Sequence, residues 1–203
     1  MQKKFLIFVE TTKICFFFDN VTSYEKPVLF DNKIIQSFDE LLELALKTNF
    51  ILGLGGVKHR YNLYHKFIDL KFSPQSVIAA NAQVSPSANL GEGLNIMSFV
   101  LIGSDSSIGT GSLINAYSSI HHDVVIGNFV EVSPGVKILG NCTIGAFTTI
   151  GTNATILPKI KIGINVIIAA GAVVTKDVPD NCMVVGVPAK IKKEINPLEI
   201  KWT

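Results

Sequence analysis

One repeat limits how this chain can fold: along about half of its length, an aliphatic residue stands at every sixth position. From Ile78 to Val174, seventeen consecutive sixth positions hold isoleucine, valine or leucine without a gap. Glycine often follows the aliphatic residue, and the position four residues after it is small or β-branched in most repeats. Neither an α-helix nor a simple alternating strand produces a period of six.

A period of six predicts a coiled parallel β-structure with one short strand and one corner per repeat. The aliphatic side chain points into a narrow interior, the small residue packs near a corner, and glycine supplies tight turns. Stacked layers then bury a continuous aliphatic column, which explains 48% hydrophobic residues beside only 9% aromatic ones. A β-sandwich is the alternative, but its strands vary in length and do not keep an unbroken period.

Length, charge and cysteine content exclude several classes of protein. The 203 residues suffice for one or two domains. A scattered net charge of +2 argues against nucleic-acid and membrane-surface partners. The chain lacks the run of about 18 apolar residues that a membrane span needs. The three cysteines lie far apart, which predicts neither a zinc site nor a disulfide framework, so we expect a reduced, cytoplasmic protein.

The chain outside the repeat divides into two further parts. The sequence predicts a small α/β domain over residues 1–76. The coiled domain is expected over residues 77–179, and a segment that closes its last coil over residues 180–203. Ser37 is the expected N-cap of the first helix, with Glu40 in the capping-box position. The strands and helices expected before the repeat are Phe5–Val9 joined directly to Lys13–Phe18, then Phe38–Lys47, Phe50–Leu54 and Val57–Phe67.

Three motifs resemble one known family. They are Phe50–Gly55 with the helix after it, Ile-His-His-Asp-Val-Val-Ile-Gly at Ile120–Gly127, and Gly171–Lys190 with its Gly-Val-Pro-Ala-Lys end. With the six-residue repeat, they resemble the hexapeptide-repeat acyltransferases, and in particular bacterial sugar N- and O-acetyltransferases of the PglD/NeuD type. The resemblance implies a left-handed parallel β-helix with three repeats per coil, preceded by a Rossmann-like domain. That domain is truncated here, because three residues replace the glycine-rich loop and helix after the first strand.

The resemblance also implies an activity. Members transfer an acetyl group from acetyl-CoA to an amino or hydroxyl group of a nucleotide-linked sugar in surface glycan biosynthesis, as homotrimers with sites between subunits. Two alternatives stay open for this chain. One is O-acetylation of a free sugar such as sialic acid, or of another small acceptor. The other is a non-catalytic β-helix that serves as an assembly module.

His121, His122 and Asp123 form the candidate catalytic group. Acyl transfer from a thioester needs a base for the attacking group, and histidine suits this task because its ordinary pKa lies near neutrality. A neighbouring carboxylate fixes the tautomer of the imidazole. Successive residues of an extended chain face opposite sides, so the two histidines cannot share one orientation. The resemblance assigns the base to His122 and the acidic position to Asp123; a surface histidine pair without chemistry is the alternative.

Metal chemistry is the rival use of these histidines. A carbonic anhydrase of the γ class has the same coiled fold and holds zinc with three imidazoles. The chain has four histidines in all, and two of them, His59 and His65, precede the repeat. We therefore expect no metal.

Donor-binding residues are expected on later coils. Gly140 lies 18 residues, or one coil, after His122, and the resemblance implies that its amide stabilises the thioester oxyanion. The same resemblance implies that the backbone at Thr152, Ala170 and Gly171 receives the pantetheine arm. Charges for the nucleotide phosphates of acetyl-CoA are offered by Lys159, Lys161, Lys176 and Lys190.

Acceptor-binding residues are expected in the first domain and on one coil. Gly55 and Gly56 precede a helix, where free N–H groups can cradle an anion. Asp19 and Asn20 match the place where relatives contact a nucleoside. Glu131 stands where relatives often carry a histidine near the acceptor or the acetyl group.

Overall fold

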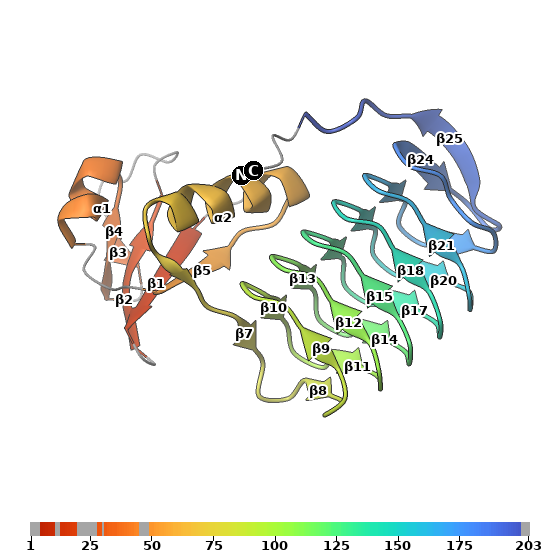
Figure 1. Cartoon of the computed structure of the whole chain (residues 1–203), viewed down its shortest axis with the longest axis horizontal. Coiled ribbons are helices and arrows are strands. Elements are labelled where there is room, and N and C mark those ends of the chain that lie inside the picture. Colours follow the sequence, from red (N-terminus) through yellow and green to blue (C-terminus); the bar gives the residue numbers. More distant parts are fainter. Residues whose placement is uncertain (1–4, 11–12, 20–27, 30, 45–48, 200–203) are drawn as a thin grey trace.

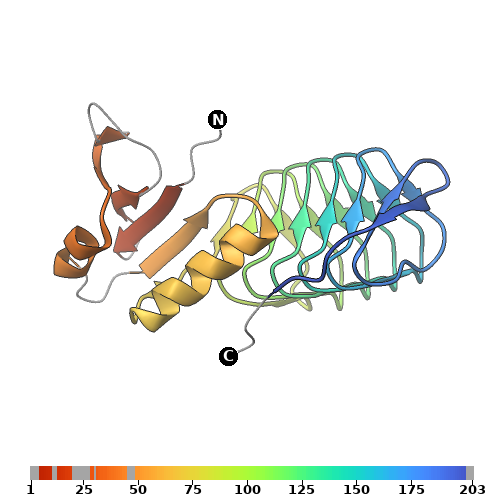
Figure 2. The same ribbon diagram turned by 90° about the horizontal axis from the view of Figure 1, so that it is seen from above.

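The computed structural model describes residues 5–10, 13–19, 28–29, 31–44 and 49–199. A small sheet with two helices adjoins a long stack of triangular coils (Figures 1 and 2). The longer helix lies between the sheet and the first coils, and the final hairpin lies at the far end of the stack.

The first region is a six-stranded mixed sheet with strand order β3-β4-β2-β1-β5-β6. Strand β1 pairs antiparallel with both β2 and β5, whereas β2–β4 and β5–β6 are parallel pairs. The elements are β1 (Phe5–Glu10), β2 (Lys13–Phe18), β3 (Val28–Leu29), β4 (Asn32–Ile35), α1 (Phe38–Leu44), β5 (Asn49–Gly53), α2 (Val57–Asp69) and β6 (Ser73–Pro74).

This region is α/β as expected, and the direct β1–β2 connection is confirmed by their antiparallel pairing. The sheet differs from the parallel order of a Rossmann-like fold because a parallel neighbour needs a long crossover, and the chain has none between β1 and β2. Ser37 caps α1, since the Glu40 N–H donates to its Oγ at 3.2 Å. The Glu40 carboxylate pairs with Lys33, so only half of the capping box forms.

The repeat region forms three sheets, in which each strand from β7 to β20 pairs in parallel with the strand three further along the chain. We call them the first (β7-β10-β13-β16-β19-β22-β24-β25), second (β8-β11-β14-β17-β20-β23) and third (β9-β12-β15-β18-β21) coil sheets. The strands are β7 (Val77–Ile78), β8 (Gln83–Val84), β9 (Asn89–Leu90), β10 (Asn95–Ile96), β11 (Leu101–Ile102), β12 (Ser107–Ile108), β13 (Leu113–Ile114), β14 (Ser119–Ile120), β15 (Val125–Ile126), β16 (Glu131–Val132), β17 (Lys137–Ile138), β18 (Thr143–Ile144), β19 (Thr149–Ile150), β20 (Thr155–Ile156), β21 (Lys161–Ile162), β22 (Ile167–Ile168), β23 (Val173–Val174), β24 (Cys182–Val185) and β25 (Lys190–Glu194).

The expected left-handed parallel β-helix is confirmed. The second residue of each two-residue strand points inward, and from Ile96 to Val174 these aliphatic residues are at most 3% exposed. Ile78 is 46% exposed because it belongs to the end coil, which has no coil beneath it. At the other end the antiparallel β24–β25 pair extends the first coil sheet.

The glycines that directly follow the inward aliphatic residues do not have the role that the sequence predicts. The expectation that they supply the turns is wrong at these positions, because their φ angles are not positive. Instead, a Cβ atom at Gly109 would lie 2.4 Å from the backbone carbon of Gly127 on the next coil. These glycines therefore allow coils to stack closely, and the left-handed corner positions hold residues such as Asp123 and Asn141.

Helix α2 fixes the first region to the coils. Arg60 on α2 is only 1% exposed, and burial lowers the pKa of its guanidinium to about 10, an effect that the Glu131 carboxylate partly offsets. It donates hydrogen bonds at 2.7–3.4 Å to acceptors of both regions: the carbonyls of Leu52, Leu54, Gly93, Gly111 and Ser112 and the Asn95 side chain.

An aromatic cluster packs beside this guanidinium. The rings of Phe129 and Phe147, one coil apart, are stacked with their centroids 5.7 Å apart. The ring of Tyr61 on α2 packs edge-on against both of them. The contact between the two regions thus combines one buried cation with an aromatic stack.

Candidate active site

The His122–Asp123 pair lies at the corner between the second and third coil sheets, after β14 and before β15. His122 Nδ1 and Asp123 Oδ2 are 2.7 Å apart. Both side chains are more than half exposed, at 57% and 51%, so the pair faces solvent. When Nδ1 carries the proton, Nδ1–H donates a hydrogen bond to the carboxylate, and Nε2 is left as an acceptor that can take a proton from a substrate.

Gly140 occupies the same corner one coil later, and the imidazole lies directly against it. A Cβ atom built at Gly140 would be 2.6 Å from both Cε1 and Nε2 of His122. Among the described residues, no acceptor pairs with the Gly140 N–H. The structure therefore brings His122, Asp123 and Gly140 together, and only glycine leaves room for the ring in this position.

Thr152, Ala170 and Gly171 lie at a different corner, between the first and second coil sheets. All three are exposed, and nothing lies within 4 Å of a Cβ atom built at Gly171. The Gly171 N–H donates to the Thr152 carbonyl at 2.8 Å, so these residues are neighbours on adjacent coils. Because the second coil sheet separates the two corners, one chain does not bring these residues to His122.

The lysines expected near the acetyl-CoA phosphates lie toward the end of the stack. Lys159, Lys161, Lys176 and Lys190 are all exposed. Lys190 begins β25 and pairs across the final hairpin with Val185. Its side chain is available to an anion in solution.

Glu131 and the Gly55-Gly56 turn, expected as separate acceptor contacts, meet each other. The Gly56 N–H donates to Glu131 Oε2 at 2.6 Å, and a Cβ atom at Gly55 would lie 3.2 Å from Oε1. Gly56 is the N-cap residue of α2. An internal carboxylate thus occupies the N-terminus of this helix, where the Gly-Gly sequence predicts an anionic ligand.

Asp19 is buried at the end of β2, only 2% exposed, and its N–H donates to the Ile35 carbonyl at 3.0 Å. This backbone contact ties it to the core of the first region. Asn20 lies outside the described residues.

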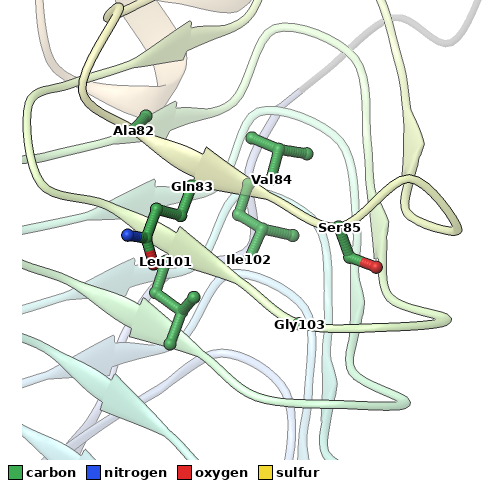
Figure 3. A pocket seen from close by; sticks show the side chains of 7 residues that line it. All are labelled: Ala82, Gln83, Val84, Ser85, Leu101, Ile102 and Gly103. Atoms are coloured by element: carbon green, nitrogen blue, oxygen red, sulfur yellow. The ribbon is translucent and has the colours of Figure 1, made fainter.

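A shallow hollow is lined by residues 82–85 and 101–103 of the first coils (Figure 3). Its volume is about 500 Å³, and Gln83 and Leu101 line it from adjacent strands of the second coil sheet. Gly103, also in its lining, stacks directly against the backbone of His121. The hollow therefore adjoins the coil below His121 and His122, and none of its lining side chains titrates near neutral pH.

Two features that attach the first region to the coils were not predicted from the sequence. Arg60 was not identified, and no local pattern marks it as buried, because a charged residue on a helix usually faces solvent. Phe129 and Phe147 were not identified either, although their spacing of one coil predicts that their rings can stack on adjacent coils. Both features depend on contacts between regions that are distant in sequence.

The part of the chain that the structure describes contains neither a cluster of metal-ligating side chains nor a membrane-spanning helix. Within them, no group of three or more histidine, cysteine or acidic side chains is placed to hold a metal ion. None of the described helices is long and apolar enough to cross a membrane.

A family model and several solved structures are similar to this chain. The family model described as bacterial transferase hexapeptide (six repeats) matches residues 105–140 and 141–176. A mutant of perosamine N-acetyltransferase from Caulobacter crescentus, solved with CoA and GDP-perosamine, is 32% identical; the match covers 83% of this chain and 82% of that chain, with a TM-score of 0.78.

Two further solved structures are similar over comparable lengths. The acetyltransferase domain of PglB from Neisseria gonorrhoeae, in complex with acetyl coenzyme A, is 28% identical over 84% of this chain and 83% of that chain, with a TM-score of 0.78. WeeI from Acinetobacter baumannii is 29% identical over 86% of this chain and 84% of that chain, with a TM-score of 0.80.

Proposed function

The chain belongs to the hexapeptide-repeat transferase family, among its β-helical sugar acetyltransferases, and we propose that it transfers acetyl groups from acetyl-CoA to the amino group of a nucleotide-linked sugar. The observation that carries the proposal is the His122–Asp123 pair lying over Gly140. We place the reaction in the assembly of surface glycans, and we place the enzyme in the cytoplasm, where the free thiols of Cys142 and Cys182 would stay reduced.

Acetyl-CoA supplies an acyl group whose thioester carbon is open to attack by an amine. His122 Nε2 takes the proton that the amine loses as its nitrogen bonds to that carbon. The Asp123 carboxylate accepts the hydrogen bond from Nδ1–H and stabilises the imidazolium that results. The Gly140 N–H donates to the carbonyl oxygen as negative charge develops on it. When the carbon–sulfur bond breaks, the proton on Nε2 is available to the departing thiolate.

The corner at Thr152, Ala170 and Gly171 fits the pantetheine arm of acetyl-CoA. This arm is narrow and alternates apolar segments with amides, and the corner offers exposed small residues along adjacent coils. Lys190 offers charge to the nucleotide phosphates of the donor. Because this corner and the His122 corner are separated within one chain, a complete site requires both corners from different copies.

We therefore propose a homotrimer. In it, the corner between the first and second coil sheets of one copy (the first–second corner) meets the corner between the second and third coil sheets of its neighbour, which carries His122. An exposed apolar patch at the first–second corner supports this arrangement. There the rings of Phe99 and Tyr117, 55% and 67% exposed, stack at 5.1 Å beside Met97 and Leu101. Light scattering should give a trimer that Tyr117→Glu dissociates, with loss of activity; a fully active monomer would contradict the proposal.

The role of His122 is tested by paired histidine variants. His122→Ala should lower turnover by about 10²–10⁴, the usual contribution of a general base, while affinity for acetyl-CoA stays nearly unchanged. His121→Ala should do much less, because it is the His122 ring that pairs with Asp123 and lies against Gly140. Equal losses from both variants, or no loss from His122→Ala, would refute the assignment.

The acceptor is proposed to bind weakly. Glu131 already accepts the Gly56 N–H, and the glycine-rich loop of relatives is replaced by three residues, so few backbone donors are left for a diphosphate. We expect a Kd nearer millimolar than micromolar, since the loss of about 3–4 kcal/mol of phosphate contacts weakens binding by a factor of several hundred.

Calorimetry with UDP-, dTDP- and GDP-linked amino sugars, beside free sugars and sialic acid, tests both the strength and the class of binding. Micromolar binding of a nucleotide sugar would mean that other groups hold its phosphates. Turnover of nucleotide-free acceptors alone would replace the proposed substrate by the second candidate, a free sugar. An absence of acetyl-CoA binding would leave the assembly module as the remaining candidate.

A further inference from the structure

We propose that Ser106 is a positioning residue for the catalytic corner, holding the His122–Asp123 turn in place from inside the coil. The inference rests on the proposed role of His122. Ser106 lies one coil below that corner and is completely buried. Its hydroxyl donates to the His121 carbonyl at 2.7 Å and accepts from the Val124 N–H at 3.2 Å. One side chain thus ties together the two backbone groups that flank the histidine–aspartate pair.

The hydroxyl is not a requirement of the repeat. The equivalent positions of the same corner on neighbouring coils hold Ala88, Val124 and Cys142. The Cys142 thiol donates to the Leu157 carbonyl at 3.1 Å and lies 4.0 Å from the Gly140 carbonyl. It also has the backbone of Ile160 as a partner, so a weaker sulfur bridge replaces the hydroxyl there. Among these described coils, only the corner with His122 is bridged on both sides by a hydroxyl. The solenoid therefore folds without a hydroxyl at this position, and Ser106 adds a local restraint.

The restraint matters because of where the imidazole lies. Asp123 has a positive φ of 57°, so its placement depends on the turn staying in the left-handed region. The ring of His122 lies against Gly140, where a Cβ atom would be only 2.6 Å from it. A small relaxation of the turn would shift Nε2 relative to the Gly140 N–H, and displacements of about 1 Å cost up to about 10²-fold in rate.

The chain offers a matched control at another corner. Ser112 is equally buried, donates to the Gly127 carbonyl at 3.1 Å and accepts from the Val130 N–H at 3.0 Å. Its corner carries none of the candidate catalytic residues. Thr148 makes the same two contacts elsewhere, with the Gly163 carbonyl and the Val166 N–H, so threonine is accommodated at such positions.

The experiment compares threonine with valine, which have the same shape but differ in the hydroxyl, at both positions. Ser106→Val should lower kcat about 10- to 100-fold with the KM for acetyl-CoA within about twofold. Ser106→Thr should restore kcat. Ser112→Val should lower the melting temperature as much as Ser106→Val but leave kcat near the wild-type value. Ser106→Ala provides a smaller variant should valine reduce the yield of folded protein.

The outcomes separate this inference from the function on which it rests. Equal kcat for Ser106→Val and Ser112→Val would mean that the hydroxyl only stabilises the fold, and would overturn the inference. Equal losses in Ser106→Val and Ser106→Thr would assign the effect to side-chain volume and would also overturn it. If His122→Ala kept full turnover, the proposed general base itself would be wrong, whatever the serine variants do.

Discussion

The two regions of the molecule are stabilised in different ways. In the solenoid every coil repeats the same contacts: an inward aliphatic residue, paired strands 18 residues apart and close backbone stacking. In the first region the contacts do not repeat, and its attachment to the coils depends on one buried arginine and a few aromatic rings. Repetition distributes stability over many equal layers, whereas the attachment concentrates it in single residues.

The largest expected change in stability follows from removing the Arg60 guanidinium. Arg60→Met should lower the free energy of unfolding by about 3–5 kcal/mol, because buried carbonyls of both regions lose their donor. Hydrogen exchange should locate the loss in β5 and α2, with the later coils still protected. Lys58→Met, at an exposed position of the same helix, is the control. Uniform deprotection of the whole chain would contradict the contrast between the regions.

A smaller effect is expected on the free energy of unfolding when a glycine of either region is replaced by alanine. Gly109→Ala should cost about 1–3 kcal/mol, because its Cβ would collide with the rigid backbone of Gly127. Gly55→Ala should cost less, since its Cβ would lie 3.2 Å from the end of the Glu131 side chain, which can turn away. Urea denaturation of both variants measures the difference. A costlier Gly55→Ala would mean that the Glu131 contact is as rigid as the stacked coils.

The smallest effect is confined to the first region. Ser37→Ala removes the acceptor of the Glu40 N–H and should destabilise α1 by about 1 kcal/mol. Ser37→Asp keeps an acceptor and should restore stability. Chemical denaturation measures the change, and amide exchange should show it in α1 alone. Loss of protection in the coils would indicate that the two regions unfold together.

The sequence predicted the solenoid well because its contacts recur at a fixed spacing. A period of six identifies the inward aliphatic residues, and the coil of three repeats that the family resemblance implies predicts that Gly140 follows His122 at the same corner, where the imidazole lies against it. The same reasoning overestimated the role of glycine in the turns. It also assigned separate acceptor contacts to Glu131 and Gly56, which bond to each other across 75 residues. No local pattern indicates a contact between a coil and a helix N-terminus.

The first region was predicted only in outline for the same reason. Its long strands and the Ser37 cap follow from local signals. The short strands β3, β4 and β6 were not predicted, because two to four residues carry too little pattern to be recognised. Arg60 was missed because a charged residue on a helix usually faces solvent, and only its partners on the coils show why it is buried.

The central claim is that the corner with His122, Asp123 and Gly140 transfers an acetyl group to a nucleotide-linked amino sugar. The most direct measurement mixes the purified protein, acetyl-CoA and such a sugar, and follows both CoA release and the mass of the sugar. The account predicts one acetyl group on the sugar nitrogen for each CoA released, and a rate that His122→Ala lowers by about 10² or more. CoA release without an acetylated sugar, or acetylation that His122→Ala leaves unchanged, would contradict it.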